Sequence, residues 1–174
     1  MEQRIHFTVR RAGLADADEI AAAHLDSIRS IGPLYYDAAV VSDWGAQVKG
    51  DLYVNAMDRG EVFYIAIGAL SETPEVLGFS SHRIDGDEHG TAVYVRGKAA
   101  HHGIGSALFR AAEAAAIAAG ATSIHIDSSL AAVQFYKANG FEEVGRGEHR
   151  LWSGRPMRCV FMRKNLAATG RRET

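Results

Sequence analysis

Small and cationic residues separate two apolar segments between residues 93 and 108. Val93 to Val95 has the β-branched and aromatic composition of a strand, and the Ala-rich segment that follows Ile104 has helical spacing. The turn between them contains Gly103 and Gly105, which have no side chain to keep a ligand away. Free backbone N–H groups and the positive end of a helix dipole attract anions at such a point. The sequence therefore predicts that this turn binds a diphosphate.

The spacing of these glycines excludes two common nucleotide sites. It fits neither G-x-G-x-x-G nor G-x-x-x-x-G-K-[ST], because no third glycine and no Lys-Ser/Thr pair follows. We therefore do not expect the anion to belong to NAD or ATP. Arg96, Lys98, His101 and His102 are near enough in sequence to supply positive charge to a different diphosphate.

A second cluster of polar and aromatic residues follows at residues 124–129 and 132–141. Together the two clusters resemble the GNAT superfamily of acyl-CoA-dependent N-acyltransferases, over roughly residues 6 to 165. The family motif Q/R-x-x-G-x-G/A falls on residues 100–105. The motif N-x-x-A-x-x-F-Y-x-x-x-G-F falls on Ser129, Ala132, Phe135, Tyr136, Gly140 and Phe141. Two residues depart from the pattern: Ala100 stands where Gln or Arg is usual, and Ser129 where Asn is usual.

The resemblance implies an α/β (α+β) fold of the GNAT type in one N-acetyltransferase domain, residues 1–174. Its core is about 6–165, with a polar tail at 167–174. The implied sheet is mixed and mainly antiparallel, with six to seven strands and helices on both faces. Its fourth and fifth strands are parallel and splay apart, so that the pantetheine arm of acetyl-CoA, the co-substrate, enters between them. The residues implied to bind it are Val93, Val95, Ala100, His101, His102, Gly103, Ile104, Gly105, Ser106, Ser129 and Phe135.

The elements that position these residues follow from the pattern of apolar residues. A helix is expected from Leu14 to Gly32, with Asp16 as its N-cap and His24 on its buried face. A second helical region is expected from about Asp37 to Lys49, and further helices over 105–119 and 131–139. Strands are expected at residues 7–10, 62–67, 76–82, 91–95, 122–127, 141–144 and 158–162. The crossover helix at 105–119 makes the strands on either side of it parallel.

Acyl transfer from a thioester needs a placed amine, a base, an oxyanion donor and an acid for the thiolate. By the family pattern Tyr136 is the acid, and a backbone N–H near Val93 meets the oxyanion. The base stays open between Asp127, at the carboxyl end of its strand, and Glu88, just before the fourth strand. His89 and His125 are further candidates, although His125 and His82 also suit buried, hydrogen-bonded positions.

The acceptor is not fixed by the sequence, so small amines, amino acids, aminoglycosides and protein amino groups all stay open. Residues 13–60 carry eight acidic residues against three basic ones, which would attract a cationic acceptor but is also ordinary for solvated helices. An alternative class of function is a catalytically silent domain that binds or senses acyl-CoA, motivated by Ala100 and Ser129. A protein-modifying enzyme is a third interpretation.

Composition narrows the possible partners and the cellular location of the protein. The chain has 174 residues, a formal net charge of −2 and no dense basic stripe, which argues against nucleic acid as its partner. Cys159 is the one cysteine, and we expect it to be a small buried hydrophobe in a cytoplasmic protein. The first residues lack a long apolar segment, so neither a signal peptide nor a membrane partner is expected. The adjacent His101 and His102 lack metal-ligand spacing, so no metal is expected. Dimers are frequent in the resembled family, which leaves a homodimer open.

Overall fold

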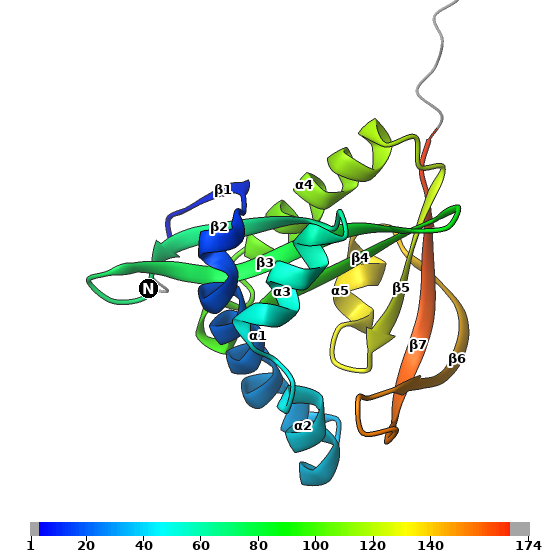
Figure 1. Cartoon of the computed structure of the whole chain (residues 1–174), viewed down its shortest axis with the longest axis horizontal. Helices are drawn as coiled ribbons and strands as arrows, with labels where there is room; N and C mark the ends of the chain where they lie inside the picture. Colours follow the sequence, from blue (N-terminus) through cyan, green and yellow to red (C-terminus); the bar gives the residue numbers. More distant parts are fainter. Residues whose placement is uncertain (1–3, 168–174) are drawn as a thin grey trace, which may run out of the picture.

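The computed structural model describes residues 4–167 as a seven-stranded mixed sheet flanked by helices (Figure 1). The predicted polar tail at 167–174 lies outside the described residues except for its first residue. The strands are β1 Phe7–Arg11, β2 Val62–Ala69, β3 Pro74–Asp85, β4 Glu88–Val95, β5 Ser123–Ser129, β6 Glu142–Arg150 and β7 Pro156–Asn165. The α-helices are α1 Ala17–Ile31, α2 Ala38–Gly45, α3 Gly50–Asp58, α4 Ile104–Ala118 and α5 Val133–Ala138. Three short 3-10 helices are η1 Leu14–Asp16, η2 Gly32–Leu34 and η3 Gly97–Ala99.

The strands lie in the order β1-β2-β3-β4-β5-β7-β6, and all neighbours are antiparallel except β4 and β5. The three consecutive strands β2, β3 and β4 form the predicted meander, because short turns join them. β7 inserts between β5 and β6, so β6 is an edge strand. The mixed, mainly antiparallel sheet with one parallel pair is confirmed.

The parallel strands β4 and β5 touch only at their amino-terminal part. Within the described chain one pair joins them, Gly90 with His125, whereas β3 and β4 pair over the whole length of β4. Beyond this pair the two strands diverge, and Figure 1 shows β5 and β7 turning away from β3 and β4. The expected divergence of β4 and β5 toward their carboxyl ends is therefore present.

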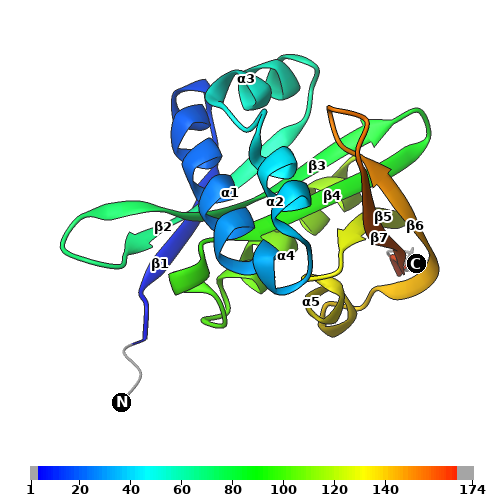
Figure 2. The same cartoon turned by 90° about the horizontal axis from the view of Figure 1, so that it is seen from below.

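Helices cover both faces of the sheet, as Figure 2 shows for α1 to α3 on one side and α4 and α5 on the other. The core on the α1 side includes Ile20, Ile28 and Ile65, each at most 1% exposed. The core on the α4 side includes Leu108 and Phe109, which are equally buried. Burying apolar surface on both faces fixes which side chains of each strand face which helices.

The segment between α1 and β2 differs from the sequence prediction. The helical region expected to reach Lys49 ends at Gly45, and a separate helix, α3, follows from Gly50. The side chain of Asp37 caps α2 by accepting a 2.9 Å hydrogen bond from the N–H of Val40. Tyr53 and Ala56 of α3 are buried against α1, so tertiary packing, rather than a strong local pattern, determines this helix.

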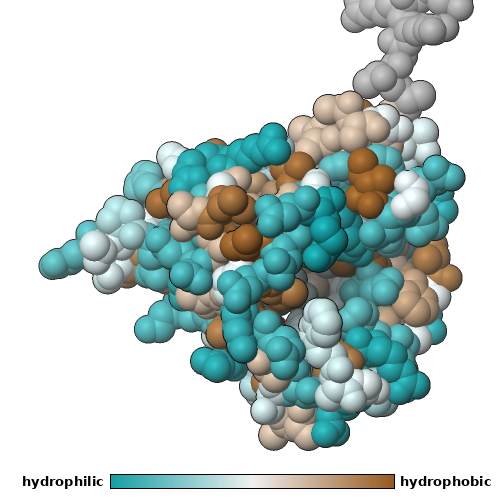
Figure 3. Space-filling model, in the orientation of Figure 1, coloured by the Kyte–Doolittle hydropathy of each residue, from teal (hydrophilic) through white to brown (hydrophobic). Residues whose placement is uncertain are grey.

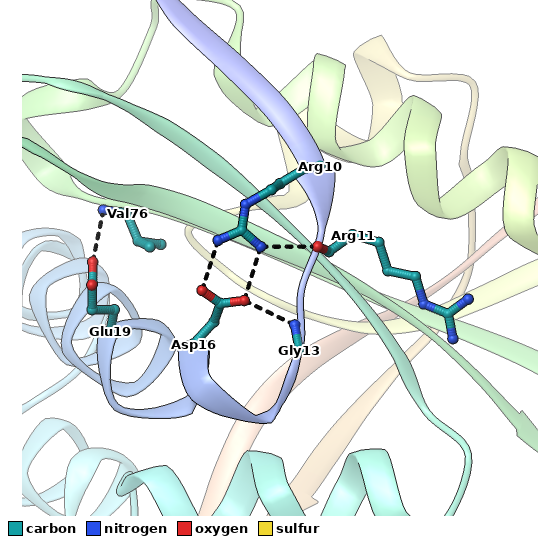
Figure 4. Close-up of polar contacts among 6 residues, drawn as sticks. All are labelled: Arg10, Arg11, Gly13, Asp16, Glu19 and Val76. Carbon is teal, nitrogen blue, oxygen red and sulfur yellow. Dashed lines mark hydrogen bonds and ion pairs between the residues drawn. The ribbon is translucent and has the colours of Figure 1, made fainter.

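Asp16 is the N-cap residue of α1, as predicted, but its side chain makes no capping hydrogen bond to the helix (Figure 4). Its carboxylate accepts two hydrogen bonds from Arg10, at 2.8 and 2.9 Å, and one of 2.8 Å from the N–H of Gly13. Glu19 accepts a hydrogen bond of 3.3 Å from the N–H of Val76, which ties α1 to β3. Both acids therefore attach the first helix to the sheet.

The ends of several strands differ from the sequence prediction by a few residues. β4 begins at Glu88, so Glu88 and His89 belong to the strand and not to the turn before it. β6 and β7 are longer than predicted because they form a hairpin that runs the length of β7. Among residues 4–167, no helix combines the length and the hydropathy needed to cross a lipid bilayer.

Candidate functional site

The turn that precedes α4 presents a row of unengaged backbone donors. Gly103 adopts φ 81° as the N-cap of α4, and His101 adopts φ 64°, a left-handed conformation that is uncommon outside glycine. Within residues 4–167, no hydrogen bond engages the backbone N–H groups of residues 101–106, and the first bonded amide is that of Ala107. Six consecutive free donors at a helix amino terminus are suited to bind an anion. The turn predicted to hold a diphosphate thus has the geometry to do so.

The start of this turn is fixed to α1. The N–H of Gly97 donates a 2.9 Å hydrogen bond to the carboxylate of Asp26. A side chain at Gly97 would lie 2.6 Å from the hydroxyl of Ser30, so only glycine allows this close approach. Arg96 lies 3.7 Å from Asp26 and 3.5 Å from Glu75, and it donates a 2.7 Å hydrogen bond to the carbonyl of Val76. Arg96 therefore holds the turn in place, while Lys98 is exposed.

Gly105 is needed for packing on α5. A Cβ at this position would lie 2.9 Å from the ring of Phe135, which is partly buried beside the turn. The two predicted motifs are therefore in contact, because Phe135 belongs to the second and Gly105 to the first. The aromatic ring covers the first turn of α4.

Tyr136 lies at the point where β4 and β5 diverge. Its side chain is 2% exposed, and its hydroxyl accepts a 3.1 Å hydrogen bond from the N–H of Val93. Among the described residues no acceptor is recorded for the proton of this hydroxyl. Burial raises the pKa of the Tyr136 phenol well above its usual value, so the group stays protonated at neutral pH. The structure thus brings together the predicted acid and the predicted oxyanion donor.

A cavity of about 180 Å³ opens on the α1 side of this point. In the space-filling view, the surface is hollowed between the helices α2 and α3 and the strands β5 to β7 (Figure 3). Tyr94 on β4 and Trp44 on α2 form aromatic walls, with their ring centroids 6.2 Å apart. The lining residues are Trp44, Arg83, Ala92, Tyr94, Ile126, Asp127, Ser129, His149, Met157 and Cys159.

The three predicted catalytic residues occupy different places. Asp127 lines the cavity from β5, together with the motif residue Ser129. Tyr136, on α5, lies where β4 and β5 diverge and contacts Val93. Glu88 begins β4, five positions before Val93, which is about 17 Å at the usual rise of a strand. Its carboxylate lies 3.9 Å from His125 and is 77% exposed, so the structure does not bring Glu88 to the cavity.

Packing and hydrogen bonds account for three other histidines, His24, His82 and His89, and for the cysteine. His82 is 5% exposed and shares a 2.8 Å hydrogen bond with His89, whose ring stacks on it. The Nδ1 of His24 bonds the hydroxyl of Tyr53, whereas its buried Nε2 has no partner among the described residues. Burial lowers the pKa of His24 to about 3. Cys159 is 3% exposed, as expected, and burial raises the pKa of its thiol.

Tyr36, which lies between η2 and α2, and Asp43 of α2 connect this part of the chain to the strands β5 to β7 beside the cavity. The hydroxyl of Tyr36 donates a 2.7 Å hydrogen bond to the carbonyl of Arg158 and accepts one of 2.8 Å from the N–H of Leu130. Asp43 pairs with Arg155 at 3.4 Å and accepts a hydrogen bond from Ser153. These contacts hold Trp44 over the cavity.

The acidic surplus in residues 13–60 is largely engaged in the fold. Asp16 pairs with Arg10, Asp26 holds Gly97, Asp37 caps α2 and Asp43 binds the hairpin. These roles favour the interpretation of the surplus as ordinary structural charge over that of a surface for a cationic acceptor.

Sequence reasoning missed most of the cavity wall. Trp44, Arg83, Tyr94, His149 and Met157 line it, yet no motif marks them. They come from five elements, α2, β3, β4, β6 and β7, that only the tertiary fold assembles. The one available signal was alternation along β4, which puts Tyr94 on the face opposite Val93.

Comparisons with known proteins identify the fold. The chain aligns with an N-acetyltransferase structure from Rhodopseudomonas palustris at 24% identity and a TM-score of 0.77, covering 91% of this chain and 95% of that one. It aligns with the PaiA N-acetyltransferase of Thermoplasma acidophilum, crystallised with coenzyme A, at 16% identity and 0.72, covering 92% and 99%. The putative acetyltransferase YncA of Salmonella typhimurium, crystallised with acetyl-CoA, aligns at 19% and 0.67, covering 96% and 98%. No curated protein matches the sequence significantly.

The fold is that of these N-acetyltransferase structures. Residues 58–143 match the family model of the acetyltransferase (GNAT) domain, from the end of α3 to the start of β6. The chain belongs to the GNAT family of N-acetyltransferases. This family assignment confirms the resemblance found in the sequence.

Proposed function

We propose that this chain transfers the acetyl group of acetyl-CoA to an amine by direct attack of the amine on the thioester. The observation that carries the proposal is the row of unengaged N–H groups at residues 101–106, beside two parallel strands that share one pair and then diverge. The turn suits a diphosphate, and the gap beside β4 suits an extended arm that bonds to the backbone near Val93 and Val95. Both parts of coenzyme A have a matching surface.

Each chemical requirement has a candidate residue. Acetyl-CoA supplies an activated thioester, whose C–S bond breaks as the new N–C bond forms. The N–H of Val93 donates to the carbonyl oxygen as it gains charge. Asp127, directly or through water, accepts the proton that the amine loses, and Tyr136 gives its proton to the departing thiolate. The phenol then regains a proton from solvent. The raised pKa of Tyr136 keeps the phenol protonated at neutral pH, so its proton is present when the thiolate departs.

Ala100 and Ser129 do not argue strongly for a catalytically silent domain. Ala100 lacks the polar side chain of the Gln or Arg that is usual at this position of the motif. The proposed anion site, however, consists of backbone N–H groups, which do not depend on that side chain. Ser129 still lines the cavity, and it has a hydroxyl that can form hydrogen bonds. We therefore favour catalysis over sensing.

A thiol-release assay with acetyl-CoA tests the proposal. The acceptor panel contains small amines, amino acids, aminoglycosides and peptides with free amino groups. We expect release of one thiol for each acetylated amine, well above the hydrolysis rate without acceptor. Saturable binding of coenzyme A with no release across the panel would instead identify a sensing domain.

A further inference from the structure

The cavity contains one permanently charged cation among its lining residues, Arg83. The guanidinium lies flat on the backbone of Gly90, since a Cβ there would be 2.8 Å from Cζ and 2.9 Å from Nη2. Gly90 is also the residue that pairs with His125, so Arg83 lies at the closed end of the cleft between β4 and β5. Glycine at position 90 therefore makes room for the guanidinium at the cavity floor.

Much of the hydrogen-bonding capacity of Arg83 is unused. Its Nε donates a 2.9 Å hydrogen bond to Asp85, an exposed carboxylate. Over the described part of the chain, no hydrogen bond or ion pair engages either Nη atom, although the side chain is only 32% exposed. Two parallel N–H donors on a planar fork match the two oxygens of a carboxylate. The unoccupied edge of the fork is thus suited to an anionic ligand.

The opposite charge lines the same cavity. Asp127 shares the face of β5 that carries His125, and its carboxylate has no recorded partner among residues 4–167. Trp44, Tyr94 and Met157 supply the rest of the wall as apolar or aromatic surface. A ligand that carries both a carboxylate and an amine would satisfy both charges and leave its apolar part against the rings.

We propose that the acceptor is an amine that also carries a carboxylate, an amino-acid-class molecule whose carboxylate is bound by Arg83 and whose amine lies toward Asp127. A phosphate dianion fits less well, because a single guanidinium would have to balance two charges with Asp127 nearby. A polyamine is disfavoured for the converse reason, since Arg83 would repel it. This inference rests on the proposed acetyl transfer, because it treats the cavity as the acceptor site.

Matched pairs of acceptors test the inference. Common α- and ω-amino acids are compared with their carboxamides, which lack the negative charge, in the thiol-release assay. We expect the wild-type kcat/KM for the best amino acid to exceed that of its carboxamide by about 10- to 100-fold, the usual effect of a hydrogen-bonded charge. Arg83→Gln should remove this preference by lowering kcat/KM for the amino acid alone, and Arg83→Lys should restore part of it. Arg59→Gln, which changes an exposed arginine outside the cavity, is the control.

Binding measurements separate this inference from the proposed function. Amino acids and carboxamides are titrated into the protein saturated with coenzyme A, and binding is followed by calorimetry. If no amine releases thiol but amino acids bind in an Arg83-dependent way, the acetyl transfer fails and the carboxylate site stands. Equal kcat/KM values for the two series, an equal loss in both on Arg83→Gln, or no Arg83-dependent binding of any amino acid would each overturn the inference.

Discussion

The backbone N–H of Val93 donates a 3.1 Å hydrogen bond to the hydroxyl of Tyr136. The two groups come from β4 and α5, 43 positions apart, and they meet where β4 and β5 diverge. In the proposed reaction the same two groups serve the two ends of the breaking thioester, its carbonyl oxygen and its sulfur. Their contact gives the buried N–H of Val93 an acceptor, and in the proposed reaction contacts to the thioester replace it.

Replacement of Tyr136 by Phe removes the proposed acid. We expect turnover to fall by about 10- to 1000-fold, the usual range for general-acid effects, with little change in affinity for acetyl-CoA. Steady-state kinetics and calorimetric titration measure the two quantities. Tyr35→Phe, at an exposed position, is the control for the loss of a phenol hydroxyl. Unchanged turnover in Tyr136→Phe would remove this residue from the mechanism.

Asp127 and Glu88 are two candidate bases that the structure separates. We expect Asp127→Asn to lower kcat by about 100-fold or more, because the amide cannot accept the proton of the amine. Glu88→Gln should leave kcat within about twofold, since this exposed carboxylate lies far along β4 from Val93. Initial rates at saturating acetyl-CoA compare the variants directly. The opposite ranking would assign the proton transfer to Glu88.

Gly97→Ala tests the close contact between α1 and the turn. The added methyl meets Ser30, so the helix or the turn must shift, at a cost of about 1–3 kcal/mol in the free energy of unfolding. We expect weaker binding of coenzyme A as well, because the turn that follows carries the anion site. Urea denaturation and calorimetry report the two effects. The double variant Gly97→Ala/Ser30→Gly should be more stable than the sum of the single effects, and simple additivity would contradict the contact.

His24 should make stability depend on pH. Its pKa is about 3 in the folded chain, because burial penalises the charged form, against about 6.5 when unfolded. Between these values the unfolded state binds more protons, so stability falls as pH is lowered. Between pH 7 and pH 5 we expect His24 to account for a loss of about 2 kcal/mol.

Urea denaturation of wild type and His24→Phe at both pH values measures this contribution. The variant keeps an aromatic ring beside Tyr94 but cannot titrate. Its stability should fall less than that of the wild type between pH 7 and pH 5. An equal fall in both proteins would show that His24 does not titrate in the way its burial implies.

Most of the fold could be predicted from local pattern. The residue patterns of β1 to β4, alternating or continuously apolar, each indicate a strand. The helix α4 between β4 and β5 requires these two strands to be parallel. α3 was missed because its helical signal is weak and Tyr53 becomes part of the core only when α1 is in place. The length of β6 was underestimated because its partner, β7, lies beyond a turn that the pattern of β6 does not reveal.

In the candidate site too, some residues could be predicted from local sequence and others could not. The turn at residues 100–106 and Tyr136 lie in contiguous motifs, so their types and spacing suffice to find them. Arg83 could not be found, because its proposed role depends on lying over Gly90 and on lining the same cavity as Asp127. The sequence suggested Arg96 as a source of charge for the diphosphate. Its contacts with Asp26 and Glu75 could not be predicted, since only the fold brings these residues to its guanidinium.

Titration of the protein with coenzyme A, followed by amide hydrogen exchange, tests the central claim most directly. The account predicts saturable binding of one molecule per chain, with slower exchange at the N–H groups of residues 101–106 and in β4 around Val95. A flat titration, or binding that leaves the exchange of these amides unchanged, would contradict it.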